Sequence, residues 1–391
     1  MTRVGILVLG MHRSGTSALT WLLGRLGAAL PSDAIDASGD NARGYWESAG
    51  LVKADDQVLR VGRSSWFDPR PLDLSRLDRG AIASRKSRIR EAIERGWGQA
   101  SILAIKDPRQ CRFVPLVAEV LTAIGIEPRA VLMLRNPAEI ARSLASRDGT
   151  TPAYAHLLWL RHMIDAERAT RGMMRAVIDY DGMLGDWRDA LARMAPLADR
   201  AGWQPESGEA QQIQSFLDPA LRHHRATLPA ELEQPLAGIV SAVDQGLRGL
   251  LVRDDVEARA TLDRAYALLD GAPWIEGDIV HDELRHRRAA ADAQAKDSVE
   301  EVAPIVAEVP ATEWPAVAPD PSGEAGLIRA SGLFDVDWYL ATYPDVAASG
   351  LDPIDHYLRI GAACGYNPNP LFDTNYYARQ MAAQMRDGDT A

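Results

Sequence analysis

The sequence predicts an α/β fold, a P-loop-type three-layer domain in which a central parallel sheet lies between helices. Two observations predict it. Segments with apolar residues at helical spacing lie between short apolar runs. The runs are rich in Val, Ile and Leu, as parallel strands buried on both faces are: Val4–Leu9, Ile102–Ile105, Ala130–Leu134 and Ala176–Ile178.

The first apolar run breaks at Gly10 into the loop GMHRSGTS. A strand that turns into a helix through Gly10 and Gly15 directs backbone N–H groups toward an anion, at the positive end of the helix dipole. The spacing is that of a triphosphate-binding loop, except that Thr16 replaces the lysine and the positive charge lies at Arg13. The following helix is predicted from leucines on one face: Leu19, Leu22, Leu23 and Leu26.

The donors of this loop indicate which phosphate compound it suits. Ser14, Thr16 and Ser17 add hydroxyl groups, and the guanidinium of Arg13 can bind two oxygens of one group. One cation with several hydroxyls suits a single phosphate bearing a small anion better than a magnesium-bound triphosphate, whose outer phosphates need the loop lysine. The loop therefore predicts a monophosphate site.

The second strand ends in AIKDPR. Because the carboxyl ends of parallel strands converge on the ligand crevice, Lys106 is a candidate second cation. Asp107 and Arg109 either pair with each other in a structural ion network or shape the acceptor side of the site.

The third strand continues into VLMLRNPAEIARSL. Arg135 ends the strand, Pro137 opens a helix, and Ser143 follows the arginine by eight residues, so that Arg135 and Ser143 can bind one phosphate. A longer helix is predicted between Ala153 and Met174, ahead of the fourth strand.

After about Ser207 the strand signals end, and apolar residues recur at helical spacing up to Ala295. We expect a domain over 1–295, with a helical extension from about 207. An acidic, Pro-rich linker is expected over 296–328, because residues 297–328 contain seven acids and no Lys or Arg. A small α-helical, repeat-like module is expected over 329–391, where LFDVDWYL and LFDTNYYA begin 38 positions apart.

Composition excludes several classes of protein. The formal charge of −11 over 391 residues argues against nonspecific nucleic-acid binding. Cys111 and Cys364 are far apart, which suggests neither a disulfide framework nor a zinc site and fits a reducing cytoplasm. No run approaches the roughly 20 apolar residues of a membrane span, so we expect a cytoplasmic protein without a transmembrane segment.

The two phosphate motifs together resemble the signatures of the PAPS-dependent sulfotransferases, over roughly residues 4–220 and in the bacterial branch that modifies carbohydrates and surface polysaccharides. The resemblance implies PAPS (3'-phosphoadenosine 5'-phosphosulfate) as donor and no metal. It implies that Arg135 and Ser143 hold the 3'-phosphate. It implies that the 5'-phosphosulfate is held by Arg13, Ser14, Gly15, Thr16 and Ser17. Arg13 departs from the cytosolic branch, which has Lys there.

Sulfuryl transfer needs an acceptor hydroxyl in line with the sulfur, a base for its proton, and positive charge on the leaving oxygen. Arg13 and Lys106 are the candidate cations. The resemblance implies Glu47 as base, because the carbohydrate branch commonly uses a glutamate after the first helix, and a histidine stays an alternative. Trp46 and Trp66 either stack on a sugar ring of the acceptor or pack in the wall of the site.

We therefore expect sulfuryl transfer to a saccharide, such as a surface polysaccharide or glycolipid precursor. A P-loop small-molecule kinase and a non-catalytic nucleotide-binding scaffold are the alternatives; the threonine at the lysine position counts against the kinase. The C-terminal module resembles modules appended to bacterial glycosyltransferases and sulfotransferases. Its aromatic residues either bind glycan or a partner protein, or form its own small core.

Overall fold

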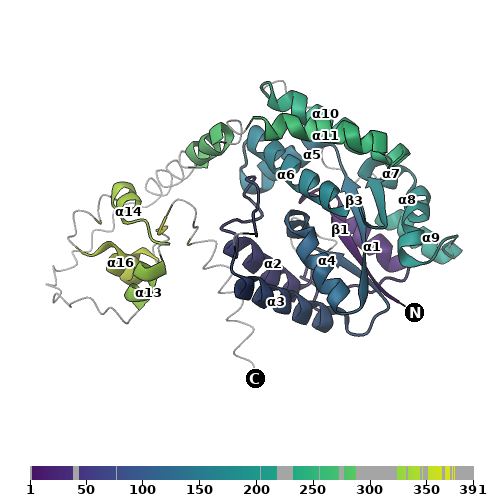
Figure 1. Cartoon of the computed structure of the whole chain (residues 1–391), viewed down its shortest axis with the longest axis horizontal. Helices are drawn as coiled ribbons and strands as arrows, with labels where there is room; N and C mark the ends of the chain where they lie inside the picture. The colour runs from purple at the N-terminus through teal and green to yellow at the C-terminus, as the bar shows by residue number, and fades with distance from the viewer. Residues whose placement is uncertain are drawn as a thin grey trace, which may run out of the picture. The chain divides into compact units, whose positions relative to one another are not determined.

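The chain divides into two compact units, Met1–Ala303 and Pro304–Ala391, each described by itself (Figure 1). The structure is a computed structural model. It describes residues 2–37, 44–75, 77–202, 204–217, 232–254, 256–272, 277–287, 324–331, 333–343, 346, 351–362, 366–369, 372 and 374.

The first unit is built on a parallel sheet with the strand order β2-β1-β3-β4, which confirms the predicted α/β class. Its strands are β1 (Arg3–Leu9), β2 (Ile102–Lys106), β3 (Ile126–Leu134) and β4 (Arg175–Asp179). Strand β3 begins earlier than the apolar run predicted, because Glu127 and Pro128 pair with Val4 and Gly5 of β1. Strands β2 and β3 lie on opposite sides of β1, so the carboxyl ends of β1 and β3 flank the switch point where ligands bind such sheets.

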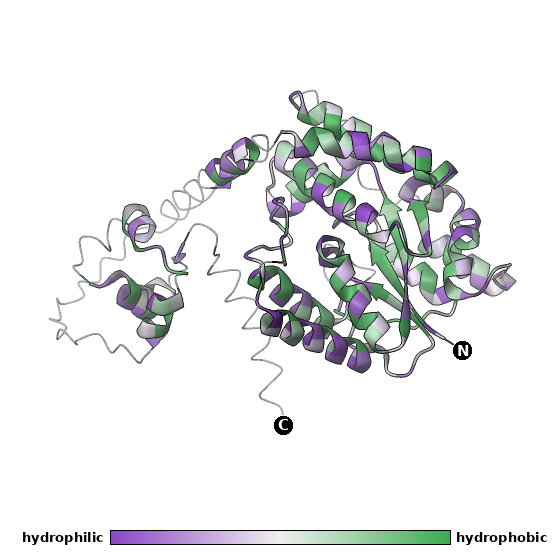
Figure 2. Ribbon diagram, viewed as in Figure 1, coloured by the Kyte–Doolittle hydropathy of each residue, from purple (hydrophilic) through white to green (hydrophobic). Residues whose placement is uncertain are grey.

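Two hydrophobic cores lie on the two faces of the sheet. Alternate strand residues enter different cores: Leu7 and Leu9 point to one, and Ile6 and Val8 to the other. Burial on both faces explains why the strands read as continuous apolar runs, drawn in green in Figure 2.

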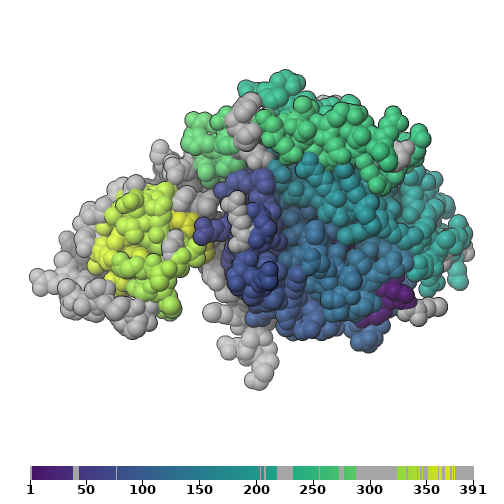
Figure 3. Space-filling view, in the orientation of Figure 1, coloured from purple at the N-terminus to yellow at the C-terminus, as the bar shows by residue number. Residues whose placement is uncertain are grey.

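Helices cover each core (Figure 1). The face of Leu7 is covered by α2 (Ala49–Val61), α3 (Arg79–Trp97), α4 (Val114–Ala123), α5 (Pro137–Asp148), α6 (Pro152–Thr170), α10 (Leu236–Val252) and α11 (Val256–Asp270). The face of Ile6 is covered by α1 (Thr16–Arg25), α7 (Tyr180–Gly185), α8 (Trp187–Met194), the 3-10 helix η2 (Ala195–Ala198) and α9 (Ser207–Phe216). Figure 3 shows α10 and α11 as a closely packed green surface above the teal helices of the first unit.

Helix caps fix the segments that follow the strands. Asn136 accepts a hydrogen bond from the amide of Ala138 at 2.9 Å and so starts α5 directly after β3. Ser48 caps α2 through the amide of Leu51 at 3.1 Å, and this cap lies one residue after Glu47. Asp107 caps the 3-10 helix η1 (Pro108–Arg112). The caps therefore set the backbone at three of the predicted site segments.

The helical extension predicted after about Ser207 is helical in the parts that the structure describes: α9, α10, α11 and residues 277–287. An ion network that is buried at Arg175 and Glu167 ties it to the sheet. Arg175 of β4 contacts Asp254 at 2.6 Å and Glu167 of α6 at 3.1 Å, and Arg171 contacts Asp263 of α11 at 2.8 Å. Within the described ranges, no helix combines the length and apolar character that a membrane crossing requires.

The second unit contains α13 (Glu324–Ser331), α14 (Val336–Thr342), α16 (Pro353–His356) and the π-helical turn η4 (Tyr357–Gly361). Helix α13 begins inside the segment expected to be linker, after the last proline of that segment and with Glu324 in its favourable first turn. Residues 296–323 lie outside the described part of the chain.

The aromatic side chains of this unit form its own core. Phe334 and Tyr339 are buried together with Val346 and Ile354. The hydroxyl of Tyr339 lies 3.0 Å from His356 Nδ1 inside that core. Of the two sequence interpretations, the described aromatics support the second, in which they stabilise the module.

Candidate functional site

The loop between β1 and α1 has the backbone of an anion cradle. Gly15, the residue before α1, adopts the left-handed region with φ 95°, and Arg13 does so with φ 69°. A Cβ on Gly15 would lie 2.4 Å from the ring of Tyr180, so only glycine fits there. The first N–H groups of α1 have no acceptor within the helix. Ser14 is fully buried, and among the described residues its Oγ has no partner.

The two phosphate motifs, although 130 residues apart, are in direct contact. The Nε of Arg13 donates to the Oγ of Ser143 on α5 at 2.9 Å. Nη1 of Arg135 donates to the carbonyl oxygen of Arg13 at 2.8 Å. Parallel strands β1 and β3 are neighbours, which brings the residues that follow them to one place.

Further contacts hold Arg135 in this position. Its Nε donates to Glu139 Oε2 at 3.1 Å, and its guanidinium carbon lies 4.7 Å from the centre of the Tyr180 ring. Glu139 is fully buried in the first turn of α5. Arg135 thus supports the strained loop at Arg13 while part of its charge is balanced by Glu139. Tyr180 was not predicted from the sequence, because it directly follows β4 and carries no motif.

Lys106, Glu47 and Ser17 meet at the end of β2. Lys106 Nζ lies 2.5 Å from Glu47 Oε1, 2.9 Å from the carbonyl oxygen of Tyr45 and 3.3 Å from Ser17 Oγ. Lys106 is 3% and Glu47 7% exposed. The residues predicted as base and second cation therefore form a buried ion pair beside the first turn of α1.

Arg109 extends this network with carboxylates on three sides. Its Nε contacts Asp56 Oδ1 at 2.6 Å, and its Nη1 lies 3.1 Å from Asp107 Oδ1 and 3.9 Å from Glu47 Oε2. Burial alone would lower the pKa of Arg109, but Asp107, Asp56 and Glu47 together raise it above its ordinary value. The ion network considered from the sequence is present, and it also reaches Glu47. Asp56 was not predicted from the sequence.

Trp66 packs against the phosphate loop. Its ring centre lies 4.6 Å from that of His12, whose ring is 6.3 Å from His162 of α6. Burial lowers the pKa of His12 well below its ordinary value, and nearby Arg109 and Arg147 lower it further, so His12 is neutral at neutral pH. The Nε2 atoms of both histidines are buried and without a hydrogen-bond partner among the described residues.

Trp46 lies next to Glu47 in the chain and has φ 58°. Its indole Nε1 is buried and has no partner in the described part of the chain. Within the same ranges, His, Cys, Asp and Glu side chains nowhere gather in a group of three or more able to hold a metal ion.

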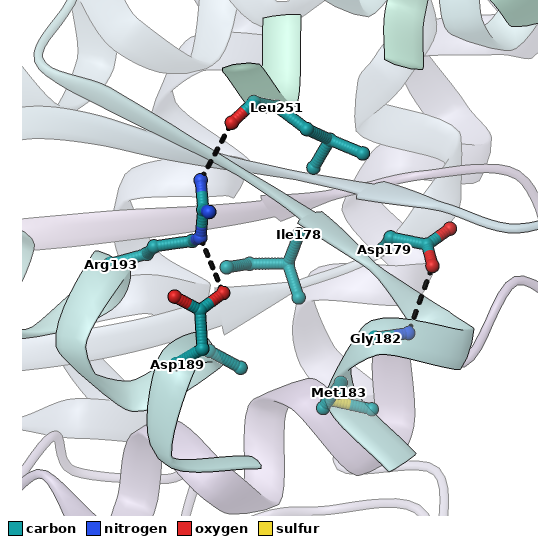
Figure 4. Close-up of a pocket in the computed structure, with 8 residues that line it drawn as sticks. Ile178, Asp179, Gly182, Met183, Asp189, Arg193 and Leu251 are labelled. Atoms are coloured by element: carbon teal, nitrogen blue, oxygen red, sulfur yellow. Dashed lines mark hydrogen bonds and ion pairs between the residues drawn. The ribbon is translucent and has the colours of Figure 1, made fainter. Parts of the chain in front are cut away.

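A separate hollow of about 220 Å³ lies at the end of β4, beside α7, α8 and α10 (Figure 4). Arg193 spans part of it, with contacts to Asp189 at 2.7 Å and to the carbonyl oxygen of Leu251 at 2.8 Å. None of the residues predicted for the site lines it. Its lining consists of Ile178, Asp179, Gly182, Met183, Asp189, Ala190, Arg193 and Leu251.

Two solved structures resemble this fold at low sequence identity. The sulfotransferase domain from the Synechococcus PCC 7002 olefin synthase is 15% identical, with a TM-score of 0.38, over 61% of this chain and 94% of that domain. The sulfotransferase domain from the curacin biosynthetic pathway is 14% identical, with a TM-score of 0.36, over 62% of this chain and 98% of that domain. Similarity at this level carries no conclusion about activity. No protein-family model and no curated protein matches the sequence.

Proposed function

We propose that this chain transfers a sulfuryl group from PAPS to a hydroxyl group of a saccharide. The observation that supports the proposal is the contact of Arg13 with Ser143 and Arg135, which brings the two predicted phosphate motifs side by side. A donor with two separate monophosphates needs two such motifs side by side. A triphosphate bound through the loop alone gives Arg135 and Ser143 no role.

The donor set suits a doubly phosphorylated nucleotide without a metal. Two guanidinium groups and the start of α1 supply positive charge, and Ser143 and Ser17 supply hydroxyls close to them. Ser14 Oγ is a buried donor that lacks a partner among the described residues, as expected of a group that binds a ligand oxygen.

The residues beside Ser17 suit the chemistry of the transfer. PAPS, when bound, supplies a sulfuryl group whose departure leaves negative charge on a phosphate oxygen. We assign stabilisation of that charge to Arg13 and Lys106. Glu47 accepts the proton of the acceptor hydroxyl, and its contacts with Lys106 and Arg109 hold the carboxylate in one orientation. Asp107, Arg109, Trp46 and Trp66 are assigned to the acceptor side, where a sugar offers both hydroxyls and an apolar ring face.

The direct test is calorimetric titration of the full chain with PAP, the desulfated 3',5'-bisphosphate product, in comparison with ATP and AMP, with and without magnesium. We expect PAP to bind without magnesium and far more tightly than ATP. Sulfate transfer from PAPS to a panel of saccharides then tests the acceptor class. Magnesium-dependent ATP binding without a preference for PAP would contradict the proposal and favour a kinase.

Ser143→Ala tests the second motif separately. In the proposed complex the Ser143 hydroxyl donates to the 3'-phosphate, and a hydrogen bond to a charged group is worth about 1.5–3 kcal/mol. We therefore expect PAP affinity to fall about 10- to 100-fold in titration. Ser146→Ala is the matched control, because Ser146 lies on the same helix and is exposed. Equal PAP affinities of Ser143→Ala and Ser146→Ala would show that Ser143 does not bind PAP.

A further inference from the structure

Two buried carboxyl groups lie behind the network of Glu47, Lys106 and Arg109. Asp55 of α2 and Asp107 after β2 both have 0% exposure. Asp55 Oδ2 accepts a hydrogen bond from Gln110 Nε2 at 2.9 Å. Asp107 Oδ1 accepts from the backbone amide of Arg109 at 3.0 Å and from its Nη1 at 3.1 Å. The other oxygen of each, Asp55 Oδ1 and Asp107 Oδ2, receives no N–H or hydroxyl donor from the described residues.

An ionised carboxylate has only acceptor atoms, so two ionised groups would leave both buried oxygens without a donor. The charges of the surroundings also disfavour a second negative charge. Asp107, Asp56 and Glu47 already face the two cations Arg109 and Lys106. A proton on Asp55 prevents a fourth negative charge from facing these two cations, and it supplies the missing donor.

The direction in which the pKa of Asp55 is shifted agrees with this geometry. Burial raises the pKa of Asp55 well above its ordinary value, and the charge of Asp107 and a hydrogen bond between the two carboxyl groups raise it further. The side-chain amide of Gln110 and the charge of Arg109 act in the opposite direction but do not reverse the shift.

We propose that Asp55 and Asp107 share one proton at neutral pH and that this pair positions Arg109 against Glu47. The proton comes from solvent when the chain folds and resides on Asp55, which donates to Asp107 Oδ2. Asp107 keeps its negative charge and directs it at Arg109, whose Nη1 also faces Glu47. Asp55 and Asp107 are thus positioning residues for Glu47. Their effect on catalysis rests on the proposed sulfuryl transfer, whereas the shared proton does not.

The shared proton has a defined effect on stability. Below the pKa of an unfolded aspartate, near 3.8, both states are protonated and Asp55 contributes no pH dependence. Above that pH the unfolded chain loses the proton and the folded chain keeps it, so the free energy of unfolding falls as pH rises, up to the raised pKa of the folded state. One bound proton corresponds to an about tenfold loss in the folding equilibrium constant per pH unit over this window.

Asp55→Asn tests the pair because its amide places an N–H donor toward Asp107 and does not titrate. From about pH 5 up to the raised pKa of Asp55 in the folded state, we expect wild-type stability to fall relative to Asp55→Asn. The wild type minus Asp55→Asn infrared difference spectrum should contain the band of a protonated carboxyl group. Asp56→Asn, the same change at the next position, should leave that band in place.

In the transfer assay, Asp55→Asn should keep KM and kcat within about threefold of wild type and Asp55→Ala should lose kcat.

Absence of the carboxyl band at neutral pH, or parallel pH profiles of stability for wild type and Asp55→Asn, would overturn the proposal. If Asp55→Asn does not fold, the test uses the wild type alone. The proposal then requires that its infrared spectrum contain the band of a protonated carboxyl group at neutral pH and that this band disappear when the pH of the native protein is raised. Absence of PAP binding with the band present would end the sulfotransferase assignment and leave the shared proton standing.

Discussion

Replacement of Lys106 by methionine is expected to destabilise the first unit by about 3–5 kcal/mol and to abolish sulfate transfer. Lys106 is 3% exposed and forms an ion pair of 2.5 Å with Glu47, which is 7% exposed. Removal of the lysine leaves a buried carboxylate whose remaining cationic neighbour, Arg109, is 3.9 Å away. Urea-induced unfolding measures the loss of stability, and transfer of sulfate from PAPS measures the loss of activity.

The double variant Lys106→Met/Glu47→Gln separates stability from chemistry. Because it removes both charges of the buried pair, we expect it to recover most of the stability lost in Lys106→Met. It should stay inactive, since both the cation and the proposed base are gone. A double variant that transfers sulfate at the wild-type rate would show that neither residue takes part in the reaction. A single variant as stable as wild type would show that the pair contributes nothing to folding.

The second large effect is expected for Gly15→Ala. Gly15 has φ 95°, and an added Cβ would lie 2.4 Å from the Tyr180 ring, which itself packs on Arg135. The loop and Tyr180 must both move, so the amide groups at the start of α1 lose their arrangement. We expect a cost in stability of about 1–3 kcal/mol for the strained backbone. In titration, PAP affinity should fall by about 100-fold or more.

Gly125→Ala is the matched control for backbone strain. Gly125 has φ 74°, but an added Cβ meets no atom within 4 Å. This variant should lose a comparable amount of stability from strain alone and bind PAP with wild-type affinity. If both variants weaken PAP binding equally, the effect of Gly15→Ala comes from general destabilisation and the loop is not the phosphate cradle.

Much of the fold was predictable because its signals are local. Strands buried on both faces need continuous apolar residues, so the runs that end at Leu9, Ile105 and Leu134 could be recognised without their partners. The turn after β1 was equally visible, since Gly15 stands where the backbone takes a positive φ. The first four residues of β3 were missed, because Glu127 and Pro128 carry no apolar pattern and are held by pairing with β1.

The candidate site was only partly predictable. The predicted residues Arg13, Ser143 and Arg135 do contact one another, and so do Glu47 and Lys106. Their partners were not predicted. Residues such as Asp55 and Tyr180 belong to no motif, and they reach the site only because α2 and the end of β4 pack beside the loop.

The sequence by itself determined the order of strands and helices along the chain, the glycine-dependent loop and the residue spacing within each of the two predicted phosphate motifs. These features depend on residues close together in the chain, through hydrophobic periodicity and backbone conformation. Only the tertiary structure decided which charges pair and which carboxyl groups are buried together. Arg13 meets Ser143 across 130 residues, and Lys106 meets Glu47 across 59. Ion pairing and protonation depend on distance and on removal from water, and folding alone sets both.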